Sequence, residues 1–143
     1  MLFGLATCGG NSGLTDLDAS LPSGTMSASV DGVAWSAIEV QAVRAGGVVT
    51  IAGSDLALLA VAFAFQGVAG TYDLGPGHAA TASVSDPSNI WAANDLQGSG
   101  TITVTTLTAT RTAGTFSFTA PASPNSGPPA TRVVTNGVFD VTF

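Results

Sequence analysis

Residues 100–119 read GTITVTTLTATRTAGTFSFT, in which threonine and serine alternate with isoleucine, valine and phenylalanine along two runs. Successive side chains of a strand point to opposite faces, so this period of two predicts one apolar and one polar face. Leu107 falls one residue out of step, which predicts a β-bulge at Thr105 and Thr106. With a turn expected at residues 111–114, the segment predicts an antiparallel hairpin in a half-buried sheet.

Upstream of this hairpin, residues 26–30 also alternate and are followed by the pair Asp31-Gly32, which favours a tight turn. The return strand is expected to run from residue 33 to about residue 44. Its alternation places Val33 and Trp35 on the inward face. A second antiparallel hairpin is therefore predicted near the start of the domain.

Helix and strand compete only in residues 56–65, because leucine and alanine favour helices. The bulky side chains there nevertheless alternate with alanines, and they are Leu59, Val61, Phe63 and Phe65. Glycines stand on both sides of the run. The period of two therefore predicts a central strand.

Residues 25–143 are expected to form one all-β domain, an antiparallel β-sandwich or flattened barrel of about eight to ten short strands. Residues 121–130 hold four prolines and are expected to form a loop outside the ladders. The last strand, residues 131–143, is expected to kink at Asn136 and Gly137. A chain of 143 residues can bury its own core without a metal or a disulfide.

Charge is scarce: 8% of the residues are charged, and three arginines against nine acidic residues give a net charge of −6. The arginines, Arg44, Arg111 and Arg132, are widely spaced, and the sequence contains no lysine. Nucleic-acid binding needs clustered cations to neutralise phosphates, so no nucleic-acid partner is expected. Hydroxyl-rich polar faces with few charges suit an extracellular domain and leave strand edges weakly protected against pairing.

Residues 1–24 contain an apolar start, the single cysteine Cys8 in the sequence Leu-Ala-Thr-Cys-Gly, and a Gly/Ser/Asp-rich stretch. This order resembles a bacterial lipoprotein cleavage box followed by a flexible tether, with Thr7 in place of the usual smaller residue. Lipidation at Cys8 is therefore expected, with membrane attachment through that anchor. The competing interpretation is an incidental thiol near the terminus.

Several short motifs also resemble an uncharacterised family of small bacterial secreted or lipid-anchored β-domains. The motifs are Gly70-Thr71-Tyr72, Gly114-Thr115-Phe116-Ser117-Phe118 and Asn136-Gly137-Val138-Phe139. The resemblance covers most of the chain from Met26 onward. It implies a β-fold and a location on the outer envelope or outside the cell, and it transfers no catalytic residues.

The chain is poor in residues that carry chemistry. His78 is the only histidine and no Gly-x-Ser-x-Gly elbow occurs, so no Ser-His-Asp arrangement is expected. One histidine and one cysteine argue against zinc, and turn formation explains most of the aspartates. We expect a non-enzymatic protein without catalytic residues, metal or cofactor.

Three residues are candidates for ligand binding: Trp91, Tyr72 and His78. Trp91 stands beside a Pro/Asn turn and is the aromatic residue expected to be most exposed, whereas Trp35 is expected in the core. If the three side chains converge, they would form a binding surface.

Three non-enzymatic functions remain open from the sequence, beside catalysis by two carboxylates that converge on a cleft. The first is a lipid-anchored envelope domain that binds a ligand or partner. The second is a structural subunit that self-associates through β-edges by strand addition. The third is a small outer-membrane barrel, because Phe139, Val141 and Phe143 resemble the terminal aromatic strand of such barrels.

Overall fold

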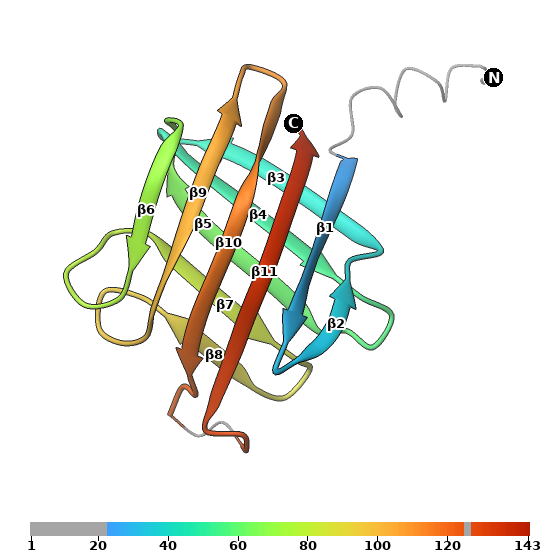
Figure 1. Cartoon of the computed structure of the whole chain (residues 1–143), viewed down its shortest axis with the longest axis vertical. Coiled ribbons are helices and arrows are strands. Elements are labelled where there is room, and N and C mark those ends of the chain that lie inside the picture. Colours follow the sequence, from blue (N-terminus) through green and yellow to red (C-terminus); the bar gives the residue numbers. More distant parts are fainter. Residues whose placement is uncertain (1–22, 125–126) are drawn as a thin grey trace, which may run out of the picture.

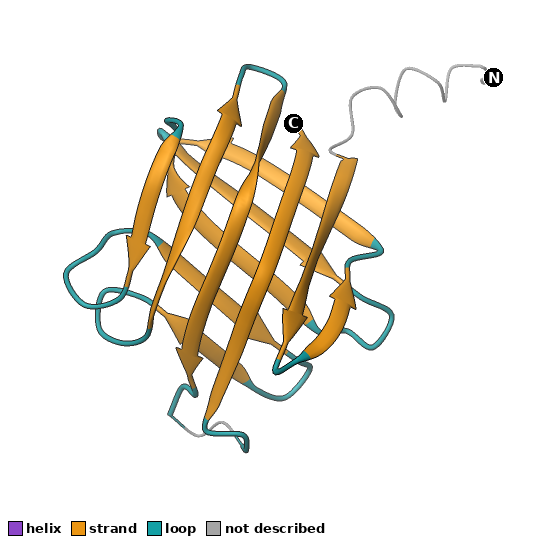
Figure 2. Cartoon of the chain, viewed as in Figure 1, coloured by secondary structure: helices purple, strands orange, loops and turns teal. Residues whose placement is uncertain are grey.

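The computed structural model describes residues 23–124 and 127–143. They form eleven strands and no helix (Figure 2). The strands are β1 Ser23–Val30, β2 Val33–Ser36, β3 Glu39–Ala45, β4 Val48–Ser54, β5 Ala60–Gln66, β6 Gly70–Leu74, β7 Thr81–Ser85, β8 Ile90–Ala93, β9 Ser99–Leu107, β10 Arg111–Pro121 and β11 Thr131–Thr142.

The strands build two antiparallel sheets that pack face to face. One sheet has six strands in the order β2-β1-β11-β10-β9-β6, and the other has five in the order β3-β4-β5-β7-β8. The strands of the two sheets cross steeply (Figure 1), as in orthogonal sandwich packing. Each sheet has two edge strands, so the described residues form a sandwich and not a closed barrel. The sandwich prediction is confirmed.

The hairpin of β9 and β10 shows how the sequence pattern becomes structure. Thr106 pairs with Ala113 and Val104 pairs with Gly114, so Thr105 stands unpaired in a bulge, as predicted. The turn comes earlier than expected, before Arg111, because the Thr108 hydroxyl accepts hydrogen bonds from the N–H groups of Thr110 and Arg111. This side-chain cap closes the turn within residues 108–111.

The core lies between the sheets, where the inward-facing side chains of both sheets meet. The ring centroid of Phe63 on β5 lies 4.8 Å from that of Phe116 on β10 and 5.0 Å from that of Phe139 on β11. The alternation in residues 60–66 thus places the bulky side chains inward, and the predicted central strand is confirmed. Residues 56–59 belong to the preceding turn, because the Asp55 carboxylate accepts the N–H groups of Ala57 and Leu59.

The predicted return strand of residues 33–44 is in fact two strands in different sheets. The Ala37 N–H donates to the Met26 carbonyl in one sheet, and the Ile38 N–H donates to the Ser54 carbonyl in the other. The chain therefore crosses between the sheets here, which raises the number of strands to eleven. Trp35 is buried as expected, but Val33 is 69% exposed because it follows the tight turn at the edge of its sheet.

The kink predicted in the last strand is a bulge in β11. Phe116 pairs with Gly137 while Phe118 pairs with Val134, so two residues of β11 face one residue of β10. Asn136 has a φ of 54° in this bulge. A Cβ on Gly137 would lie 2.5 Å from the Phe116 ring, so only glycine lets the ring pack this closely.

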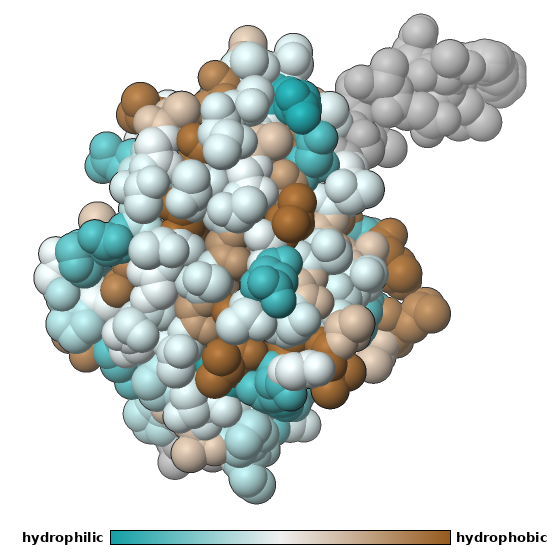
Figure 3. Space-filling view, in the orientation of Figure 1, coloured by the Kyte–Doolittle hydropathy of each residue, from teal (hydrophilic) through white to brown (hydrophobic). Residues whose placement is uncertain are grey.

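The outer face of the six-stranded sheet is covered mainly by hydroxyl side chains. Figure 3 shows pale colours over most of the face formed by β9, β10 and β11, with a few separate apolar residues. Register places Thr71, Thr103 and Thr115 side by side across β6, β9 and β10. Threonine thus supplies the polar face where other proteins use lysine and glutamate.

A cleft at the open corner of the sandwich

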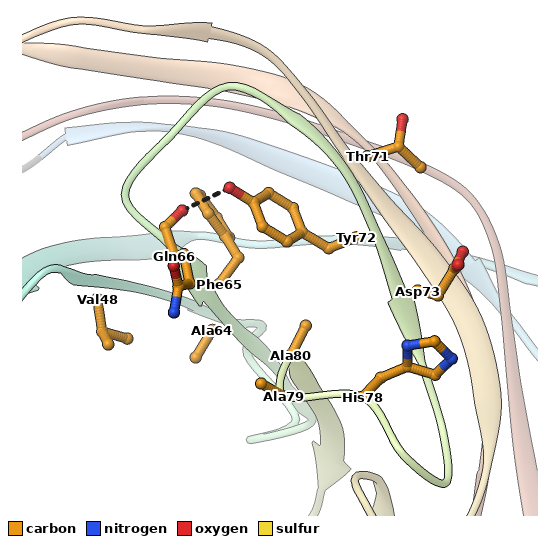
Figure 4. A pocket seen from close by; sticks show the side chains of 10 residues that line it. All are labelled: Val48, Ala64, Phe65, Gln66, Thr71, Tyr72, Asp73, His78, Ala79 and Ala80. Carbon is orange, nitrogen blue, oxygen red and sulfur yellow. Dashed lines mark hydrogen bonds between the residues drawn. The ribbon is translucent and has the colours of Figure 1, made fainter.

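Crossed sheets meet closely at some corners and separate at others. A cleft of about 440 Å³ lies at the corner where β6 separates from β4 and β5 (Figure 4). Ten residues line it: Val48, Ala64, Phe65, Gln66, Thr71, Tyr72, Asp73, His78, Ala79 and Ala80. Its volume is within the range of small-molecule sites. None of its lining residues comes from β9, so the cleft lies on the side of β6 that faces away from β9.

Tyr72 forms an aromatic wall of the cleft. Its ring centroid lies 5.5 Å from that of Phe65. Its hydroxyl donates to the Gln66 carbonyl at 2.8 Å and also contacts the Val68 carbonyl, which ties β6 to the loop before it (Figure 4). Because the hydroxyl is already bonded, the ring is the part of Tyr72 that remains for a ligand.

His78 and Asp73 are the imidazole and the carboxylate of the cleft, and both residues are exposed. The backbone N–H of His78 donates to the Gly75 carbonyl, which closes the turn around Pro76 and holds His78 beside β6. Figure 4 shows the two side chains on the same side of the cleft, with the Asp73 carboxylate on the outer side of β6. Within residues 23–124 and 127–143, neither residue has an ion-pair partner.

No arginine lines the cleft, because all three arginines are engaged elsewhere. Arg111 forms an ion pair with Asp140, and Arg132 forms one with Asp31, each at 2.8 Å. Arg44 donates to the Thr108 carbonyl and lies over the Phe143 ring. These interactions leave Asp73 as the only formally charged side chain among the lining residues.

Tyr72 and His78 therefore come together in the cleft, but Trp91 does not. Trp91 is 0% exposed, and its indole N–H donates to the Pro129 carbonyl at 2.7 Å. The Arg132 guanidinium lies 4.4 Å from the centre of its ring. The expectation that Trp91 is exposed is wrong, because the proline-rich loop folds back and pairs Ala122 with Trp91.

The arrangement offers contacts rather than a nucleophile and base. In the part of the chain that the structure describes, no hydroxyl is hydrogen-bonded to the His78 imidazole, and no three potential metal ligands gather. Cys8 lies outside the described residues. Phe65 and Gln66 also border the cleft: alternation correctly places the Phe65 side chain in the core, and nothing local in the sequence marks the corner where β5 ends.

Comparisons with other proteins identify the domain but assign it no activity. Among the described residues, no helix is long and apolar enough to cross a bilayer. No curated protein and no solved structure matches the chain. A family model described as a domain of unknown function, DUF6252, matches residues 23–141, which is nearly the whole described domain. The chain belongs to the DUF6252 family.

Proposed function

We propose that this domain is a non-enzymatic binding module whose ligand occupies the cleft at the open corner. The observation that carries the proposal is the half-buried Tyr72 ring, which packs on the buried Phe65 ring and borders a hollow of about 440 Å³. Pockets of this size with an apolar lining and a few polar groups are the usual form of small-ligand sites. The ligand is expected to have an apolar body and to be neutral or cationic, because Asp73 disfavours anions.

A blocking substitution tests this proposal. Ala79 is exposed at the cleft, so Ala79→Trp would fill the space beside Tyr72. We expect p-cresol, used as an aromatic probe, to shift the amide NMR signals of Tyr72 and Gln66, and the substitution to abolish those shifts. Ala109→Trp, on the exposed turn between β9 and β10, is the matched control. Equal shifts in both variants would contradict the proposal.

We further propose that the module is held on the outer surface of a bacterial cell by lipid at Cys8. The support is the sequence around Cys8 and the Gly/Ser/Asp-rich residues that separate it from β1. Mass spectrometry of the protein from its native host is the test. A lipid-modified Cys8 as the first residue is expected, and an unmodified Cys8 in a chain that retains Met1 would contradict the anchor.

A second candidate function is self-assembly by strand addition at β2. This edge strand contains no charged residue, and unpaired edges without charges are prone to pairing. Figure 3 shows apolar side chains near this edge and the β4–β5 loop, and the exposed ones are Val33, Ile38, Leu56 and Leu58.

Light scattering across a range of concentrations tests this second function. Association is expected to increase with concentration, and Ala34→Lys is expected to remove it by placing a charge on the β2 edge. Ala109→Lys adds the same charge away from the edge. A monomer at every concentration would contradict strand addition.

A further inference from the structure

The cleft lies beside an unpaired strand edge. β6 is the last strand of the six-stranded sheet, and β9 is the only strand with which it pairs in the described residues. Successive residues of an antiparallel strand direct their N–H and C=O groups alternately to its two sides. Half of the backbone groups of β6 therefore point toward the side where the cleft lies.

Loops limit how much of this edge a partner can reach. The loop of residues 67–69 stands at one end, where Tyr72 ties it to β6. At the other end, Leu74 bridges to Ala80, so the chain covers the edge there. Thr71, Tyr72 and Asp73 remain open, a length of about 10 Å at ~3.3 Å per residue.

The edge of β8 shows what an occupied edge looks like in this domain. Trp91 pairs with Ala122, and the Ser123 N–H donates to the Ile90 carbonyl, so the chain itself supplies a short partner segment. The same fold thus already covers one edge with a short extended segment. No described segment pairs with Thr71, Tyr72 or Asp73 on the side away from β9.

The side chains of β6 divide by face in a way that selects a partner. Tyr72 is half-buried and points into the cleft, while Thr71 and Asp73 are exposed on the outer face. A segment paired with β6 would alternate in the same way. One of its side chains would enter the cleft against Tyr72, and the next would lie beside the carboxylate of Asp73.

Charge and size define those two side chains. Asp73 lacks an ion-pair partner among the described residues, and the whole chain carries a net charge of −6. Both facts favour a lysine or arginine beside Asp73. The half-buried Tyr72 ring, backed by the buried Phe65 ring, favours an aromatic side chain within the cleft.

We infer that the open edge of β6 binds a short extended peptide with an aromatic residue next to a basic one. The backbone would pair with Thr71, Tyr72 and Asp73, and the aromatic ring would occupy the cleft. Strand addition of this kind takes affinity from main-chain hydrogen bonds and specificity from pockets for alternate side chains. The inference rests on the proposed function, because it names the ligand class of the same cleft.

The test titrates the full chain with the blocked peptide acetyl-Thr-Phe-Lys-Thr-amide and follows the amide signals of Thr71, Tyr72 and Asp73. Replacing the peptide lysine by glutamate should weaken binding about threefold to fivefold. Two further peptides are methylated on the amide nitrogen of phenylalanine or of lysine. Since successive N–H groups point to opposite sides, one methylation should weaken binding by up to about tenfold and the other should not.

Protein variants complete the test. Asp73→Asn should make the lysine and glutamate peptides bind about equally, whereas Glu39→Gln on β3 should preserve their difference. Equal binding of both methylated peptides would overturn strand pairing. If p-cresol shifts the cleft signals and no peptide does, the peptide class is wrong and the cleft remains a small-ligand site. If neither shifts them, both the inference and the proposed function fail.

Discussion

Two corners of the sandwich each contain an aromatic residue on an edge strand, but one corner is closed by a loop and the other is open. Trp91 and Tyr72 each lie on a short edge strand beside a turn that contains proline. At the Trp91 corner the loop between β10 and β11 folds back, Pro129 accepts the indole hydrogen bond and Arg132 covers the ring. At the Tyr72 corner the following loop meets the strand only at Leu74, and a cleft remains. The return of a loop decides which aromatic residue can meet a ligand.

The largest expected effect of a substitution is at the closed corner. Trp91→Ala should lower the free energy of unfolding by about 3–5 kcal/mol, because it removes a fully buried ring and leaves a cavity. Tyr72→Ala, at a half-buried ring, should cost only about 1.5–3 kcal/mol. Urea unfolding of both variants measures the difference. A larger loss for Tyr72→Ala would show that the open corner carries more of the stability.

Arg132 should contribute less than Trp91 to the closed corner. Arg132→Met keeps an apolar stem over Trp91 but removes the cation–π contact and the ion pair with Asp31, so we expect a loss of about 1–2 kcal/mol. Urea unfolding at low and high salt measures this loss. Arg111→Met removes an ion pair that is more exposed and should shift the midpoint less. Equal shifts would mean that the ring contact contributes little.

The open corner should respond to a smaller change. Tyr72→Phe removes the hydrogen bonds to the Gln66 and Val68 carbonyls and should cost about 0.5–1.5 kcal/mol. The ring and its contact with Phe65 remain. Hydrogen exchange should therefore become faster at residues 67–70 and stay unchanged at β8. Unchanged exchange in the loop would show that the hydroxyl does not hold it.

The smallest expected effect depends on pH. Hydrogen bonds from Arg111 lower the pKa of Asp140, and the Ser88 N–H lowers the pKa of Asp86. The unfolded chain then binds these protons more readily than the folded one, so their stabilisation is present above the ordinary aspartate pKa of about 3.9 and is lost as the pH falls through the lowered values. The urea concentration at the unfolding midpoint should therefore decrease slightly as the pH falls below about 4.

Asp140→Asn is the check on this pH dependence. It should flatten the acid dependence of the urea midpoint, while Glu39→Gln, at an exposed carboxylate on β3, should leave it unchanged. An acid dependence identical in the wild-type protein and Asp140→Asn would contradict the role of the Arg111 ion pair.

Much of the fold could be predicted because the sequence patterns that specify its strands and bulges are local. The alternation in β9 and β10, the bulge at Thr105 and the kink at Asn136 all follow from residues within a few positions of one another. The candidate site was predicted only in part. Tyr72 and His78 meet in the cleft, while Trp91 was placed wrongly, because its cover comes from Pro129, 38 residues further along the chain.

The sequence by itself determined the all-β character, which face of most strands is buried, and the scarcity of charge. Each of these depends on period-two patterning or on composition, which act along a single strand. The tertiary structure decided that residues 33–44 divide between two sheets, that Val33 faces solvent and that Phe65 borders a cleft. These outcomes depend on how two twisted sheets cross and where their corners close. That geometry is set by contacts between residues far apart in the chain.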